Sequence, residues 1–210
     1  MDLREFRQLA RQEASAAPQV DAVLLEQDLL LRESVLAGQI ERADGVVLSN
    51  EQVVGDEPLP DFLAPVSDKQ YRLAGDGTWE AYYRYVFQLA AEHHSPFLRK
   101  WVVFEVTLRN ALAEERAGKL GLDAHGYLIA DDLAGGWAGV SGDVDSVADT
   151  VSEWAAAPDL LSAAKVLDRR RRRWLEENAG YFTFAVDELL SYARGLVLVN
   201  RWQALEQKEN

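Results

Sequence analysis

Apolar residues recur every three or four positions through most of the chain. Stretches of strictly alternating apolar and polar residues rich in valine, isoleucine and threonine are missing. The first spacing places apolar side chains on one face of a helix, whereas the second is typical of a half-buried strand. We therefore predict an all-α fold, a helical bundle of about six to eight helices.

Start and stop signals divide this pattern into separate helices. A serine before a proline marks a helix start at Ser95, and a glycine after an apolar stripe marks an end at Gly38 and at Gly121. Ser49 and Gln52 have the spacing of a capping box. We predict helices over residues 2–12, 20–37, 78–94 and 96–119, a short one after Ser49, one opened by Pro158, and a last one from a cap at Thr183 to Leu205.

The prolines between Pro58 and Pro65 form the clearest internal boundary. Proline lacks the backbone donor and biases the residue before it away from helix, so an extended connection is expected here. We predict an N-terminal helical unit of residues 1–57, a connection of residues 58–77 and a C-terminal helical unit of residues 78–210. In the last unit we expect an acidic loop region over residues 121–157, with its glycines in the loop: Gly135, Gly136, Gly139 and Gly142.

The two predicted units share a short pattern. Residues 28–35 and 105–112 both contain an acid, then Leu-Arg three residues later, then a polar residue and an aliphatic one. This similarity suggests two related helical units, in which Asp28 and Arg32 match Glu105 and Arg109. We assign Asp28 and Arg32 the same role, a structural ion pair that fixes helix register.

The charge and the residue types missing from the chain narrow the range of functions. There are 35 Asp and Glu residues against 22 Lys and Arg, a net charge of -13 that repels nucleic acid and favours a basic partner surface. The chain has no cysteine, which excludes disulfides, thiolate metal sites and a cysteine nucleophile. No apolar run approaches the roughly 18 residues that span a bilayer, so we expect no membrane insertion and a cytoplasmic location.

Glu105 is the most informative acidic residue, because it is set into the apolar stripe of the helix over residues 96–119. Arg109 follows one turn later, at the spacing where an acid and a base pair best. We interpret the two as a structural ion pair that fixes helix register. The alternative, a general acid or an ion-handling carboxylate, requires a second titratable group nearby, and the sequence shows none at a suitable spacing.

His93 and His94 are the only adjacent histidines. Neighbouring residues on a helix point about 100° apart, so the two side chains cannot face one metal ion together. We predict a helix-terminal pair without a metal or a cofactor. A small metal-dependent enzyme that uses His93, His94 and Glu105 remains an alternative.

Five consecutive arginines occupy residues 169–173 and sweep through more than one helical turn. Arg171 falls on the apolar stripe, where its stem would cover the core while its head stays in water. The other four are expected to be exposed and to contact either the chain's own acidic segment, residues 121–164, or an acidic partner: Arg169, Arg170, Arg172 and Arg173. Another alternative is therefore a helical adaptor that docks an acidic ligand through this run.

The helix over residues 96–119 also carries a family signature. PFLRKW at residues 96–101, FE at 104–105, LRNAL at 108–112, Arg116 and KLGL at 119–122 resemble the uncharacterised family encoded beside bacterial V/A-type ATPase genes. That family is distantly similar to the central-stalk subunit called C in archaeal enzymes and d in vacuolar ones. Residues 59–63, 184–193 and 199–202 resemble its proline hinge and closing helix, while Glu33 stands where an Asn is expected in the first unit.

The resemblance implies a helical, non-catalytic subunit that seats the rotary shaft on the membrane ring. Its expected partners are V/A-type ATPase subunits of the central stalk and the ring, in a complex for ion or proton transport at the inner face of the cell membrane. The acid, Asn and Arg spacing of the family's repeated helical motif matches Glu105, Asn110 and Arg116, so Asn110 and Arg116 are also expected to fix helix register. Contact with the membrane would be indirect, through the partner complex.

Overall fold

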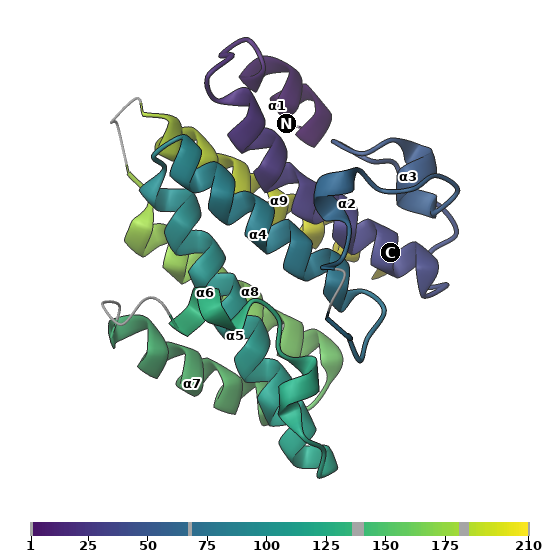
Figure 1. Cartoon of the computed structure of the whole chain (residues 1–210), viewed down its shortest axis with the longest axis vertical. Helices are drawn as coiled ribbons and strands as arrows, with labels where there is room; N and C mark the ends of the chain where they lie inside the picture. Colours follow the sequence, from purple (N-terminus) through teal and green to yellow (C-terminus); the bar gives the residue numbers. More distant parts are fainter. Residues whose placement is uncertain (1, 67–68, 136–140, 181–184, 210) are drawn as a thin grey trace. The chain divides into compact units, whose positions relative to one another are not determined.

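The computed structural model describes residues 2–66, 69–135, 141–180 and 185–209 (Figure 1). All regular structure in these ranges is helical, which confirms the predicted all-α class. Within them lie nine α-helices and two short 3₁₀ helices: α1 (Leu3–Ala10), α2 (Ala17–Leu36), α3 (Asn50–Val54), η1 (Asp61–Leu63), α4 (Asp76–Glu92), α5 (Pro96–Leu120), η2 (Ala124–Tyr127), α6 (Asp131–Gly135), α7 (Ser141–Ala155), α8 (Leu160–Asn178) and α9 (Val186–Glu209).

The chain forms two compact units. Unit 1 combines Met1–Asp61 with Asn178–Asn210, and unit 2 comprises Phe62–Glu177. The boundary after Asp61 falls in the predicted connection, residues 58–77. The predicted C-terminal unit, residues 78–210, is wrong at its end, because α9 packs against α1 and α2 and so completes unit 1.

Unit 1 is held together by contacts of α2 with α1, α3 and α9. Its core includes Leu24 and Leu29 of α2 with Leu190 of α9, all of them buried. A buried ion pair at 2.6 Å joins Arg194 of α9 to Glu26 of α2. The capping box at Ser49 is present, and Gly38 has the left-handed backbone conformation expected after α2.

Unit 2 is organised around α5, which contacts α4, η2, α6 and α7. Ser95 caps the first turn of α5, and Gly121 ends the helix with a left-handed residue, as the sequence predicts. Trp174 of α8 packs among three aromatic rings of α5, with ring centroids 5.1 to 5.7 Å apart: Phe97, Trp101 and Phe104. This aromatic cluster forms the part of the core between α5 and α8.

The predicted acidic loop, residues 121–157, is instead mostly helical, since η2, α6 and α7 lie within it. Gly135 ends α6 and Gly142 lies inside α7, so neither is in a loop, while Gly136 and Gly139 lie outside the described residues. Although this segment is rich in acids, α7 has an apolar stripe at helical spacing, and its buried positions include Val147 and Val151. Thr183, the expected cap of the last helix, also lies outside the described residues, and α9 begins at Val186.

Candidate functional site

Glu105 lies in the interior of unit 2 and binds an arginine of α8. Its carboxylate accepts hydrogen bonds from both sides of the Arg171 guanidinium, at 2.8 and 3.0 Å, and its relative exposure is 2%. Arg171 also donates to Asp168 at 3.1 Å. The predicted pairing of Glu105 with Arg109 is therefore wrong, because Glu105 forms its buried ion pair with Arg171. The guanidinium of Arg171, expected to stay in water, is bound to two carboxylates.

Arg109 joins α5 to a different helix. It donates to Asp76, in the first turn of α4, at 3.0 Å, and its guanidinium lies 5.1 Å from the ring centre of Trp79. Periodicity places Glu105 and Arg109 one turn apart, but it does not show that the two side chains turn toward different neighbouring helices. Their separate partners link α5 to both α4 and α8.

Asn110 and Arg116 contact two further segments. The Asn110 amide donates to the carbonyl of Ile129 at 2.9 Å and accepts from the Ile129 backbone N–H at 3.1 Å, and both residues are buried. Arg116 lies over Trp154 of α7, 5.0 Å from the ring centre. The residues expected to fix helix register thus bind four different segments of unit 2.

The arginine run is less exposed than its composition predicts. Arg170 is buried, with its guanidinium 5.0 Å from the ring centre of Phe104 and a 2.8 Å hydrogen bond to Ser146, so the prediction that it is exposed is wrong. Arg169 binds Glu153 at 2.7 Å, which confirms the expected contact with the acidic segment. Arg172 and Arg173 remain exposed, and Arg172 lies 3.5 Å from Glu176 of its own helix.

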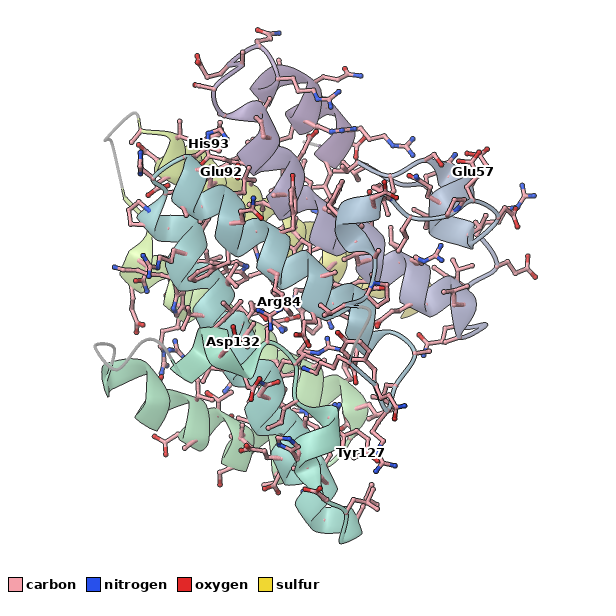
Figure 2. All side chains as sticks on the ribbon, viewed as in Figure 1. Glu57, Arg84, Glu92, His93, Tyr127 and Asp132 are labelled. Atoms are coloured by element: carbon pink, nitrogen blue, oxygen red, sulfur yellow. The ribbon has the colours of Figure 1, made fainter. Side chains whose placement is uncertain are left out.

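A network of alternating charges on unit 2 was missed in the sequence. Lys69 binds the buried Glu80 at 2.6 Å, and Arg84 bridges Glu80 and Asp132, with its closest contact to each at 2.8 Å; Figure 2 shows Arg84 and Asp132 directed toward each other. Burial alone would raise the pKa of Glu80, but the hydrogen bonds from Lys69 and Arg84 outweigh it and hold the pKa below its ordinary value. Arg84 likewise lowers the pKa of Asp132. The i, i+4 spacing of Glu80 and Arg84 was the available signal.

In unit 1, Asp28 caps a loop instead of pairing with Arg32. Its two carboxylate oxygens accept the backbone N–H groups of residues 46, 47 and 48 at 2.6 to 2.8 Å. Burial raises the pKa of Asp28, although the three amide hydrogen bonds act in the opposite direction. Arg32 donates to the carbonyl of Gln52 in α3. The shared sequence pattern of Asp28 and Glu105 therefore serves different contacts in the two units.

His93 lies at the C-terminal end of α4 (Figure 2), and His94 follows it directly, as expected. Both are exposed, so His93 does not continue the buried stripe of that helix. Among the described residues, no group of three or more His, Asp or Glu side chains lies close enough together to hold a metal ion. Glu105, the third residue of the metal-enzyme alternative, is bound to Arg171.

An open groove of about 660 Å³ runs between α5 and α7. Its lining combines small apolar residues with charged ones: Ala111, Glu114, Glu115 and Lys119 of α5, and Ala148, Val151, Ser152, Ala155 and Ala156 in and just after α7. Lys119 spans one end, donating to the carbonyl of Ala155 at 3.2 Å. The groove was not predicted from the sequence, because the segment that forms α7 was expected to be a loop.

Comparison with family models places these contacts in a shared sequence region. Residues 56–210 match the model described as "Protein of unknown function (DUF2764)". The chain belongs to this family. The DUF2764 region includes all of unit 2 and the C-terminal segment of unit 1, so it contains Glu105 with its partner Arg171, the charge network and the groove.

Searches of curated proteins and of solved structures found no match. None of the described helices is both long enough and apolar enough to cross a membrane.

Proposed function

We propose that this protein is a non-catalytic helical subunit, or accessory protein, of a bacterial V/A-type rotary ATPase. In this role it couples the central stalk to the membrane ring through protein contacts and takes no part in ATP chemistry. The complex would carry ions or protons, and this chain would lie at the inner face of the cell membrane through its partners.

The proposal is supported first by where the resemblance falls. The residues most similar to the ATPase-associated family lie on α5, the helix around which unit 2 is organised. The DUF2764 match also spans those residues. A motif on the helix that contacts most of unit 2 and inside the family region is the expected location for a feature that defines the family's structure.

The observation that carries the proposal is the burial of Glu105 against Arg171. A general acid or base must reach its substrate, whereas this carboxylate is 2% exposed and binds a guanidinium with both oxygens. Three other residues of the signature, Arg109, Asn110 and Arg116, contact Asp76, Ile129 and Trp154 respectively. Such contacts make a helix of 25 residues, about 37 Å long, a stiff element suited to transmitting force.

Purification of the tagged full-length chain from the organism that encodes it tests the proposal. V/A-type ATPase stalk and ring subunits should co-purify in constant ratio after mild solubilisation of the membranes, and ATP hydrolysis should be present only in fractions that contain the catalytic subunits. An unrelated tagged acidic protein from the same cells is the control. Recovery of the chain without ATPase subunits, from cells shown to contain the assembled ATPase, would refute the proposal.

The second candidate function is a helical adaptor that docks an acidic partner through the arginines of residues 169–173. Few of these arginines are available for such a contact. Arg170 and Arg171 are committed to the interior and Arg169 binds Glu153, which leaves Arg172 and Arg173 as the exposed pair. Changing both to Gln should abolish binding of an acidic partner if that function is correct. Unchanged binding would reject it.

A further inference from the structure

The groove between α5 and α7 has the form of a seat for another helix. Its floor consists of short side chains, so a second backbone can approach closely: Ala111, Ala148, Ala155 and Ala156. Ala148 and Ala156 are exposed, and a Cβ atom at Gly118, on the same helix as Ala111, would meet no atom within 4 Å apart from its own stretch of helix backbone. Grooves between packed helices with an apolar floor are common docking sites for amphipathic helices.

Three exposed leucines lie close in sequence to residues of the groove lining. Leu120 and Leu122 follow directly after Lys119 and are 72% and 48% exposed. Leu160, which opens α8 four residues after Ala156, is 91% exposed. Single exposed leucines are ordinary on a protein surface, but three that follow the lining segments closely in sequence enlarge the apolar surface available to a partner.

The charge around the groove selects a basic partner. Three charged residues line it, the acids Glu114 and Glu115 and the base Lys119. Lys119 is already engaged with Glu115 and with the carbonyl of Ala155. Glu114, on the groove wall, is exposed and forms no ion pair with any described residue. A complementary helix would therefore carry its Lys or Arg residues beside its apolar stripe.

We propose that this groove docks a basic amphipathic helix of a partner protein. The apolar stripe of that helix lies on the alanine floor, and its basic side chains bind Glu114 and Glu115 on the α5 wall. The inference goes beyond the proposed function and does not depend on it, because it specifies the chemistry of the partner segment and not the complex that contains it.

A synthetic helix tests the inference directly. The probe is a fluorescein-labelled peptide of about 18 residues, five helical turns, with leucine on one face and lysine on the other. A twin peptide carries glutamate in place of lysine. In fluorescence anisotropy titrations with the full-length chain, the lysine peptide should bind at least about tenfold more tightly than the glutamate twin, and added salt should weaken it. Equal binding of the two peptides would overturn the proposal, as would no binding of the lysine peptide.

Two matched variants distinguish the groove from general attraction to an acidic protein. Ala148→Arg fills the groove and adds a positive charge, whereas Ala91→Arg makes the same change at an exposed alanine of α4. We expect Ala148→Arg to weaken lysine-peptide binding at least about tenfold and Ala91→Arg to leave it near the wild-type value. Equal binding by the two variants would overturn the proposal.

A substitution at an exposed residue of the groove tests the site in a protein that should keep its fold. Glu114→Lys alters an exposed side chain and should retain the wild-type circular dichroism spectrum and melting temperature while weakening the lysine peptide several-fold. Unchanged binding by a folded Glu114→Lys protein would again contradict the groove as the site. If the peptide results are as expected and no ATPase subunit co-purifies, the groove assignment stands and the rotary-ATPase proposal fails. If ATPase subunits co-purify but the lysine peptide does not bind, the rotary-ATPase proposal stands and the groove assignment fails.

Discussion

Breaking the Glu105–Arg171 pair should destabilise the protein strongly, and by different amounts from its two sides. Arg171 is shared by two buried carboxylates, Glu105 and Asp168. Arg171→Met removes the guanidinium from both of them, whereas Glu105→Gln leaves Arg171 bound to Asp168. The arginine variant should therefore be the less stable of the two.

The magnitudes follow from burial. Loss of one member of a buried ion pair costs about 3 to 5 kcal/mol, and replacement of both members by uncharged groups of similar size often costs much less. Glu105 is 2% exposed and the Arg171 side chain is 16% exposed. We therefore expect Arg171→Met to lower the free energy of unfolding by about 5 kcal/mol and Glu105→Gln to lower it by about 3 kcal/mol. The double variant should be less destabilised than the sum of the two by about 2 kcal/mol or more.

Urea denaturation followed by tryptophan fluorescence measures these differences, because Trp174 and Trp101 lie in the same core as the pair. Arg172→Met is the matched control, since Arg172 is one residue away but 73% exposed, and it should change the free energy of unfolding by less than about 0.5 kcal/mol. Additive effects of the two core substitutions, or a cost of Arg171→Met no larger than that of the control, would refute the assignment of a structural ion pair.

Three further substitutions test other contacts. Asn110→Leu removes both hydrogen bonds to a buried backbone segment and should lower the free energy of unfolding by about 2 to 4 kcal/mol in urea titrations; a loss below about 1 kcal/mol would contradict this. Asp28→Ala leaves three loop amides without their acceptor and should speed their hydrogen exchange, measured by mass spectrometry, while unchanged exchange argues against the cap. Arg84 holds the pKa of Glu80 and of Asp132 low in the folded state, so its contribution is present above about pH 4.5 and is lost as pH falls through those lowered values. The stability deficit of Arg84→Gln should thus be largest near about pH 7 and shrink toward about pH 3, and a deficit independent of pH would contradict that sign.

The ends of helices could be predicted from the sequence where local chemistry determines them. The capping box at Ser49, the cap at Ser95 and the left-handed glycines at Gly38 and Gly121 each satisfy the backbone of their own helix, so the residue type alone is informative. The missed helix α7 shows the limit of this reasoning. Its first residues include Gly142, Asp143 and Asp145, and its apolar positions indicate a helix only once α5 provides the surface that buries them.

The partners of charged side chains were harder to predict than the helices, because these partners depend on tertiary packing. Spacing predicted Glu105 with Arg109 and Asp28 with Arg32, yet none of these residues binds the one beside it in the pattern. A surface pair one turn apart contributes only about 0.2 to 0.5 kcal/mol, which is too little to hold a side chain when a buried carboxylate needs a closer donor. The arginine run provided that donor for Glu105 from 66 residues away.

The distribution of charge along α5 links the buried contacts to the outer surface. Toward the interior, Glu105 and Asn110 bind Arg171 and Ile129, and these contacts leave little freedom for the helix to shift against its neighbours. Later in the same helix, Glu114 reaches solvent on the groove wall and forms no ion pair with the described residues. A helix fixed along its buried face and charged along its exposed one presents a preorganised surface, so a docking partner loses less entropy on binding than it would on a mobile segment.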